Sequence, residues 1–365
     1  MVYNINKGSE TMEPYKAQKL PVEYKIDKEL LQLLAEANEK YGQYKLLIET
    51  FKFDSRFFLN SIILSESLKS TQIEGTQISQ DEVYYLKYKD KELDDEIIEI
   101  RNIKKMIEFS EDALKKDVKI NISLINDMHK ILLNSVRGAE KNPGKLRTNQ
   151  NWIGPRGAGI EEAVYVPPMS DEVPLLLDNL FEYMSDKYVD SPLINLAISH
   201  AQFETIHAYS DGNGRLGRAL IPIHLSILKE EKPILFLSEV IELYKPTYNR
   251  TLNESRKGNM GGFIKFFLQC IIEQCNSNIY KIKSINQIYN EDLQKVSKLK
   301  GYTAYKAMPA LIKMIVFTKQ ELMEEIGCHR NTLSLLIENL IKLDIIVEEE
   351  STYKYKRAYD VFVSN

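Results

Sequence analysis

Twelve consecutive residues, HAYSDGNGRLGR at 207–218, constrain this chain more than any other segment of similar length. A histidine stands four positions before an aspartate, Gly-Asn-Gly follows, and two arginines then stand three positions apart. Beyond the second glycine, apolar residues recur at helical spacing, at Leu216, Leu220, Ile223 and Ile227. This periodicity predicts a helix that begins near Asn213 and carries Arg215 and Arg218 on neighbouring faces.

The residue types in this segment suit a site for a polyphosphate. Gly212 and Gly214 allow a tight turn and leave backbone N–H groups open to an anion. A helix start adds unpaired N–H donors and the positive end of the helix dipole. The guanidinium groups of both arginines match phosphate oxygens. Asp211 is placed to hold Mg²⁺ against the same phosphates, and His207 is placed to take a proton from an incoming hydroxyl.

Each of these residues also has a common structural interpretation. Gly-x-Gly is often only a turn, Asp211 before a glycine is a frequent turn residue or helix cap, and a single histidine is usually a packed residue. The functional interpretation therefore depends on the joint order of the polar and glycine positions, which chance rarely supplies.

The segment resembles the signature of the Fic family, H-P-F-x-D/E-G-N-G-R-x-x-R. The matching positions are His207, Asp211, Gly212, Asn213, Gly214, Arg215 and Arg218. Ala208 and Tyr209 replace the usual Pro and Phe, which are structural positions. The resemblance implies a protein adenylyltransferase that transfers AMP from ATP, with Mg²⁺, to a Ser, Thr or Tyr hydroxyl of a target protein.

The resemblance also assigns roles to residues. His207 is the general base and Asp211 the metal ligand. Asn213, with the backbone N–H groups of 212–214, stabilises phosphate charge, Arg215 binds phosphate, and Arg218 binds the γ-phosphate. The full set of implied nucleotide contacts is Glu204, Thr205, Ile206, His207, Gly212, Asn213, Gly214, Arg215, Leu216, Gly217, Arg218, Tyr248 and Asn249. Near the adenine the family has a Tyr-Tyr pair where this chain has Tyr248-Asn249, so the base preference is less defined than the phosphate chemistry.

A glutamate stands in the last turn of another predicted helix, directly before Gly75. A carboxylate is mildly unfavourable there, because the helix C-terminus is already negative, and this suggests a cationic partner. The stretch resembles the inhibitory motif of the family, S/T-x-x-x-E-G/N, through Ser70, Glu74 and Gly75. The resemblance implies that Glu74 pairs with Arg218 and withholds it from the γ-phosphate.

The composition excludes several classes of protein. The net charge of −4 provides no global basic field for nucleic acid. Cys270, Cys275 and Cys328 have no metal-ligand spacing, which fits a reducing compartment. Neither a basic-then-apolar leader nor a run of about 20 apolar residues is present, so we expect a soluble cytoplasmic protein with no membrane association.

The remaining periodicity predicts a mainly α-helical fold in three parts. These are an N-terminal helical region at 1–115, a catalytic domain at 116–300 and a C-terminal domain at 301–365, with Gly301 at the boundary. Helices are expected from 28, and over about 44–70, 81–115, 121–133, 178–187, 192–206, 213 onward, 239 onward, 263–275 and 277–300. Segments 145–154 and 163–168 are expected to form a β-hairpin. By the resemblance, this hairpin is the flap that clamps a target segment by strand pairing.

Residues 317–340 follow a helix-turn-helix rhythm, with Thr318 as a cap and Gly327 at the turn, and 352–362 alternate like a wing hairpin. The tail resembles the winged-helix domain that ends many bacterial Fic proteins. The side chains that could contact DNA are those of His329, Arg330 and Lys342, together with Lys354, Lys356 and Arg357 on the predicted wing. Glu324, Glu325, Glu338 and the acidic run at 348–350 oppose this, so a protein-contact or structural role is favoured over DNA binding.

Two other functions stay open on the sequence alone. One is the same fold with different chemistry, either removal of AMP with Glu74 positioning water or transfer of another nucleotide or phosphate group. The other is a winged-helix regulator that senses nucleotide without catalysis. The sequence identifies neither the target, which can be the chain itself, nor the oligomeric state, although a homodimer could gate the inhibitory helix.

Overall fold

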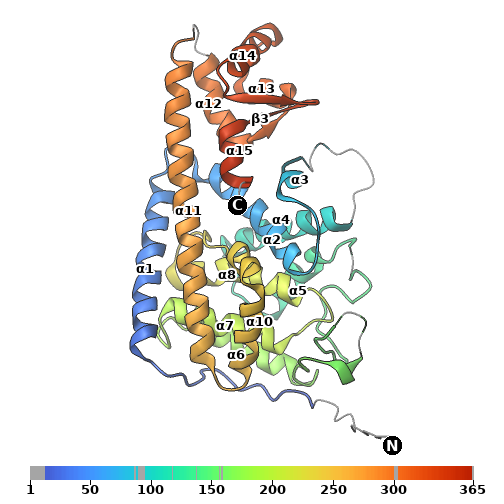
Figure 1. Cartoon of the computed structure of the whole chain (residues 1–365). Coiled ribbons are helices and arrows are strands. Elements are labelled where there is room, and N and C mark those ends of the chain that lie inside the picture. Colours follow the sequence, from blue (N-terminus) through green and yellow to red (C-terminus); the bar gives the residue numbers. More distant parts are fainter. Residues whose placement is uncertain are drawn as a thin grey trace, which may run out of the picture.

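The computed structural model describes residues 13–85, 88, 95–116, 118–136, 138–155, 157, 159–299 and 303–363. Helices dominate this part of the chain, as predicted, and one small sheet lies near the C-terminus (Figure 1). Up to residue 206 the helices are α1 (Lys28–Glu49), α2 (Ser55–Ile73), α3 (Gln80–Tyr85), α4 (Asp95–Leu114), α5 (Ile122–Leu132), the 3₁₀ turn η1 (Ile160–Glu162), α6 (Val173–Ser185) and α7 (Pro192–Ile206). They are followed by α8 (Asn213–Lys229), α9 (Ser238–Leu243), α10 (Lys245–Arg256), α11 (Met260–Val296), α12 (Thr303–Met314), α13 (Lys319–Ile326), α14 (Arg330–Lys342) and α15 (Lys356–Val363). The strands are β1 (Val316–Phe317), β2 (Ile346–Glu349) and β3 (Thr352–Tyr355).

Helices α7 and α8 form the centre of the molecule and enclose the signature loop between them. Helix α7 begins and ends at the predicted residues, and α8 begins at the predicted Asn213. A proline at the first position of α7 fits the helix start, because its missing N–H would have no partner there. Apolar residues lie all round α7, so it is buried on every side, against α6, α8 and α11.

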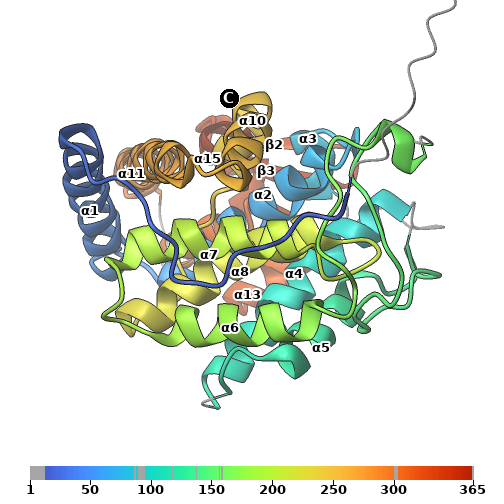
Figure 2. The same ribbon diagram turned by 90° about the horizontal axis from the view of Figure 1, so that it is seen from below.

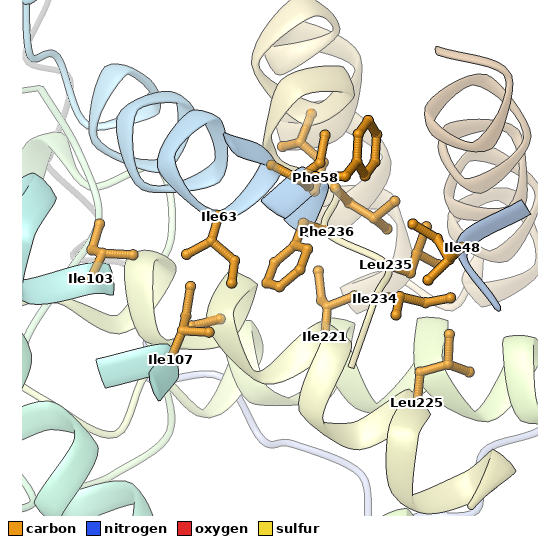
Figure 3. Packing of buried hydrophobic residues seen from close by; sticks show 14 of the residues in the cluster. Ile48, Phe58, Ile63, Ile103, Ile107, Ile221, Leu225, Ile234, Leu235 and Phe236 are labelled. Carbon is orange, nitrogen blue, oxygen red and sulfur yellow. The ribbon is translucent and has the colours of Figure 1, made fainter. Parts of the chain in front are cut away.

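Helix α2 is fixed to the centre through its apolar face. Figure 3 shows Phe58 and Ile63 of α2 beside Phe236 of the segment that follows α8, with Ile221 of α8 and Ile107 of α4 in the same cluster. All five side chains are buried. The helix that carries the inhibitory motif is therefore part of the main core.

The segment before α1 runs across the surface of α7 toward the predicted flap (Figure 2). Asn179 of α6 binds both backbone groups of Leu20, and Gln202 of α7 donates to the carbonyl of Gln18 at 2.8 Å. We call residues 13–22 the N-terminal strap.

The described part of the C-terminal region has the predicted helix-turn-helix. Thr318 and Glu321 form a capping box at α13, and Gly327 ends that helix in the left-handed conformation. The sheet is antiparallel with strand order β1-β3-β2. This element order agrees with the winged-helix prediction but does not establish a DNA-binding role, and Gly301 lies outside the described residues.

Three local predictions were wrong. The hairpin in the tail is β2–β3, and 356–363 is helical because Ala358, Tyr359 and Phe362 pack one face of α15 into the core. Lys356 and Arg357 therefore lie on α15 and not on a wing. Helix α11 continues through 276, since no glycine or proline interrupts it and α1 and α15 cover its sides (Figure 1). Helix α1 extends to Glu49, and α2 starts only after its cap Asp54.

The predicted flap also differs from the expectation. Among the described residues between 145 and 168, strand pairing is limited to one antiparallel bridge, between Ile153 and Tyr165. The flanking backbone has other partners: the N–H of Arg147 donates to Ala208, and the carbonyl of Val166 accepts from Tyr15 of the strap. These contacts replace the ladder of a longer hairpin.

No helix in the described residues is both long and apolar enough to cross a membrane.

Candidate active site

The signature loop is locked by its own side chains. His207 ends α7 with φ 48°, and Gly212 precedes α8 with φ 76°. Asn213 accepts from the N–H of Tyr209 at 2.8 Å and donates to its carbonyl at 2.7 Å. Both polar groups of the amide are thereby used within the loop. The predicted contribution of Asn213 to stabilising phosphate charge stays a prediction.

His129 of α5 packs against the signature loop and hydrogen-bonds to it. Its ring stacks on Tyr209 with centroids 3.9 Å apart, and its Nδ1 accepts from the N–H of Gly144 at 2.9 Å. Nε2 then carries the proton and donates to the carbonyl of Asp211 at 2.9 Å. The sequence predicted the helix over 121–133 that carries His129 but gave no signal that this residue positions the loop.

Arg215 takes part in a buried network of ion pairs. It is 2% exposed, and its guanidinium lies 3.2 Å from Glu99 of α4 and 2.9 Å from Asp211. Glu99 is equally buried. Arg215 therefore joins α4, the loop and α8, and its predicted contact with phosphate stays a prediction.

Arg218 is held by the end of α2. Its Nε donates to Oγ of Ser70 at 3.0 Å, and its Nη2 donates to the carbonyl of Ser70 and to Oε1 of Glu74, each at 2.8 Å. Gly75 follows with φ 104°, a conformation that favours glycine. The predicted Glu74–Arg218 ion pair is present, and both Ser70 and Gly75 contribute to the geometry that the motif implied.

The Glu74 carboxylate lies over the start of α8. A Cβ atom at Gly214 would come within 2.7 Å of Oε1 of Glu74. Partial burial acts to raise the pKa of this carboxyl, but Arg218 outweighs it and holds the pKa below its usual value. Glu74 is thus ionised and occupies the position where the first N–H groups of α8, which have no intrahelical acceptor, would meet an anion.

His207 lies beside this site with a partly exposed side chain. Burial of the ring, followed by the charges of Arg256 and Arg147, lowers its pKa to about 4. The imidazole is therefore neutral near pH 7, which is the form that can accept a proton.

Comparisons with known proteins agree with this geometry. The model of the Fic/DOC family matches residues 119–225, and that of the Fic/DOC family N-terminal region matches 31–111, together just over half of the chain. The chain belongs to the Fic/DOC family.

Individual relatives of this Fic protein are distant. The protein adenylyltransferase Fic of Drosophila willistoni is 24% identical over 178 residues, which are 48% of this chain and 32% of that protein. The match thus covers about a third of the relative. A Fic family protein from Desulfovibrio desulfuricans G20 has a TM-score of 0.59 at 21% identity, over 91% of this chain and 97% of the other. For Fic-1 from C. elegans the TM-score is 0.52 at 18% identity, over 70% and 72%. These structural matches support the helical Fic fold.

The other residues predicted to bind nucleotide differ in their exposure to solvent. Ile206 and Leu216 are buried in the core. Tyr248 is 4% exposed, and its hydroxyl lies 3.0 Å from Nε2 of His200, whereas Asn249 is exposed on α10. In this structure of the Fic protein, the charged neighbours of Tyr248 include Arg218 of the signature segment and Glu74, and an adenine pocket at residues 248 and 249 stays a prediction.

Glu204 is buried against Gly217, where a Cβ atom would come within 2.2 Å of its Oε1. Burial raises the pKa of Glu204 to about 7. A side chain at position 217 would therefore require the Glu204 carboxyl to move. The hydroxyl of Thr205 accepts a hydrogen bond from Nε of Arg256 at 3.2 Å. Arg256 was missed by the sequence analysis, because a charged residue at a helix end carries no distinctive pattern.

The fit of Mg²⁺ to this Fic protein depends on Asp211. Its side chain is 33% exposed, and Oδ1 accepts from Arg215 and from the N–H of Gly212. Within the described residues, no cluster of three or more His, Cys, Asp or Glu side chains could hold a metal. A single accessible carboxylate suits Mg²⁺, which is usually bound by one or two carboxylates together with substrate phosphates and water.

The buried Glu99–Arg215 pair gives a stability prediction. Glu99→Gln should lower the free energy of unfolding by about 3 kcal/mol, because it leaves a buried guanidinium short of a counter-charge. Denaturant unfolding followed by circular dichroism measures this. Glu108→Gln on the same helix is the control: Glu108 is 53% exposed and 3.7 Å from Lys104, so its loss should cost less than about 1 kcal/mol. Equal effects of the two variants would contradict a structural role for the buried pair.

Proposed function

We propose that this Fic protein is a protein adenylyltransferase that transfers AMP from ATP to a Ser, Thr or Tyr hydroxyl of a target protein, and that Glu74 inhibits it. The observation that carries the proposal is the arrangement around the start of α8. A neutral His207, the accessible carboxylate of Asp211 and unpaired N–H groups of α8 lie at one surface, and Glu74 holds Arg218 there. Distant relatives with the name protein adenylyltransferase support the reaction class.

The target oxygen forms a bond to the α-phosphorus of ATP, the bond from that phosphorus to the bridging oxygen of the β-phosphate breaks, and pyrophosphate leaves. The hydroxyl proton goes to the imidazole of His207. The N–H groups at the start of α8 bind phosphate oxygens. Asp211 would hold Mg²⁺ together with the phosphates, and the bound ion would neutralise part of their charge.

Inhibition follows from competition for Arg218. While Glu74 holds the guanidinium, the γ-phosphate lacks its cationic partner and meets a carboxylate at the same place. A charge-assisted pair of this kind, 36% exposed on the Glu74 side, stabilises the inhibited state by about 1.5–3 kcal/mol. That energy corresponds to about ten- to a hundredfold in activity.

A test of donor chemistry uses the Glu74→Gly protein with a cell extract as the source of targets. Label from ATP carrying ³²P at the α-phosphate should enter protein, either a target or the chain itself, and chelation of Mg²⁺ should prevent it. ATP labelled at the γ-phosphate should give no protein label beyond that of the extract alone, whose own kinases transfer this phosphate. Transfer of the γ-label, or labelling by another nucleotide in preference to ATP, would contradict the proposed reaction while leaving the fold intact.

A further inference from the structure

We propose that Arg256 is a positioning residue that fixes the end of α7, and with it His207, to the segment around Tyr165 and to the N-terminal strap. The inference deepens the proposed function and rests on it for its kinetic consequence. Its geometric part stands on contacts that do not depend on the reaction.

Arg256 uses its whole guanidinium group. Nε donates to the Thr205 hydroxyl at 3.2 Å, Nη2 donates to the Glu204 carbonyl at 3.2 Å, and Nη1 donates to Oδ1 of Asn253 at 2.7 Å. The face of the guanidinium lies over the ring of Tyr165, 3.6 Å from the centroid. A planar fork with five donors can make these contacts together, and an ammonium group cannot.

Tyr165 and the strap complete the connection. The Tyr165 hydroxyl donates to the carbonyl of Thr205 at 2.8 Å. Tyr15 of the strap donates from its hydroxyl to the carbonyl of Arg256 at 2.8 Å and from its N–H to the carbonyl of Val166 at 2.9 Å. The strap reaches this point after crossing α7 (Figure 2). Three segments far apart in the sequence therefore meet at Arg256: α7 and Tyr165 contact its guanidinium, and the strap contacts its backbone carbonyl.

These contacts address a specific need of α7. The last four carbonyls of a helix have no intrahelical donor and carry partial negative charge. Arg256 binds the carbonyl of Glu204, Tyr165 binds that of Thr205, and Arg147 binds those of Ile206 and His207 at 3.4 and 2.9 Å. His207, the next residue after α7, has a left-handed backbone conformation. Arg256 and Arg147 thus fix the last turn of the helix and, through it, the position of the His207 side chain.

Arg256 also contributes to the field at His207. The charged groups that act on this imidazole are Arg256 of α10, Arg147 of the segment before Ile153 and Glu74 at the end of α2, and the backbone of Glu204 also hydrogen-bonds to the ring. After burial, Arg256 is the largest cause of the lowered pKa of His207. Removal of the Arg256 charge should therefore raise the pKa of His207, whereas a lysine should retain most of the effect.

The experiment compares Arg256→Gln and Arg256→Lys in the Glu74→Gly background. Positioning predicts that both variants lose kcat by about ten- to a hundredfold, with the KM for ATP changed by less than about threefold. NMR titration of His207 separates charge from geometry, because its pKa should rise in Arg256→Gln and stay near the parent value in Arg256→Lys. Arg250→Gln is the matched control, since Arg250 lies on the same helix, is 61% exposed and pairs only with Glu254 among the described ion pairs.

Three results would overturn the proposal. They are an unchanged kcat in both Arg256 variants, a loss that appears only in the KM for ATP, and full recovery of kcat in Arg256→Lys. If Arg256→Gln does not fold, Tyr165→Phe removes the hydroxyl bond to Thr205 and keeps the ring, and it should lower kcat in the same way. If the parent transfers no AMP, the proposed function fails. The geometric inference is then tested by amide hydrogen exchange at 205–208, which should accelerate in the Arg256 variants and not in Arg250→Gln.

Discussion

Replacement of Glu74 by glycine is expected to raise the rate of AMP transfer by about ten- to a hundredfold. Glu74 holds Nη2 of Arg218 at 2.8 Å and lies where an anion would meet the start of α8. Its removal frees a guanidinium that is otherwise 2% exposed and takes a negative charge out of the phosphate site. The transfer of α-phosphate label to protein, measured as an initial rate at fixed ATP, gives the size of the effect.

The chain offers a closely matched control for this change. Lys69 and Glu242 form a second ion pair at α2, 3.7 Å apart, and Glu242 is 37% exposed where Glu74 is 36% exposed. Glu242→Gln should leave the transfer rate unchanged, because it does not touch Arg218. Addition of Arg218→Gln to the Glu74→Gly protein should remove the gain. An equal activation by Glu242→Gln would show that loosening α2, and not freeing Arg218, increases the activity.

Helix α2 is anchored to its neighbours, and we therefore expect Glu74 to stay in its position beside Arg218. Glu66 accepts from the N–H and hydroxyl of Ser238 at 2.9 and 2.6 Å, and Lys245 donates to the carbonyl of Ile73. At the other end of α2, the ring of Phe58 lies 5.8 Å from that of Phe362 in α15. The inhibitory turn is thus fixed on both sides by buried contacts.

The sequence predicted the parts of the site that are encoded locally. The ends of α7 and α8 follow from Pro192, from the glycines of the loop and from apolar spacing. The Glu74–Arg218 pair followed from two motifs whose relation the family resemblance supplied. The helix ends are thus signalled by residues close to them, whereas the ion pair needed the family resemblance to relate two motifs 144 residues apart.

The rest depends on contacts between distant segments. Arg215 is paired with Glu99, which lies on another helix and has no local feature that marks a buried partner. The flap was predicted as two strands, but the strap and Arg147 take the backbone groups that a ladder would need. The ring of Tyr248 packs among His200, Phe263 and Phe266, and its role at the nucleotide stays a prediction. Residue type alone cannot distinguish an aromatic residue in the core from one that binds a ligand.

Replacement of His207 by alanine is expected to lower kcat in the Glu74→Gly background by at least about 10²–10⁴-fold, with the affinity for ATP nearly unchanged. His207 is the partly exposed imidazole next to the phosphate site, whereas the rings of His129, His200 and His224 are buried and engaged in hydrogen bonds. Single-turnover transfer of α-phosphate label measures kcat, and equilibrium binding of ATP measures the affinity. A variant that still labels its own chain at the parent rate would exclude His207 as the base.

The dependence on pH provides an independent check of the same role. The base must be neutral, so activity should be present above the pKa of His207, about 4, and be lost as the pH falls through it. Bound phosphates add negative charge beside the imidazole, which favours its cationic form and raises its pKa. The acid limb of kcat, which reports the ATP complex, should therefore lie at higher pH than that of kcat/KM, which reports the free enzyme. Coincident limbs would mean that the titrating group lies away from the phosphates, and the base would then have to be sought elsewhere.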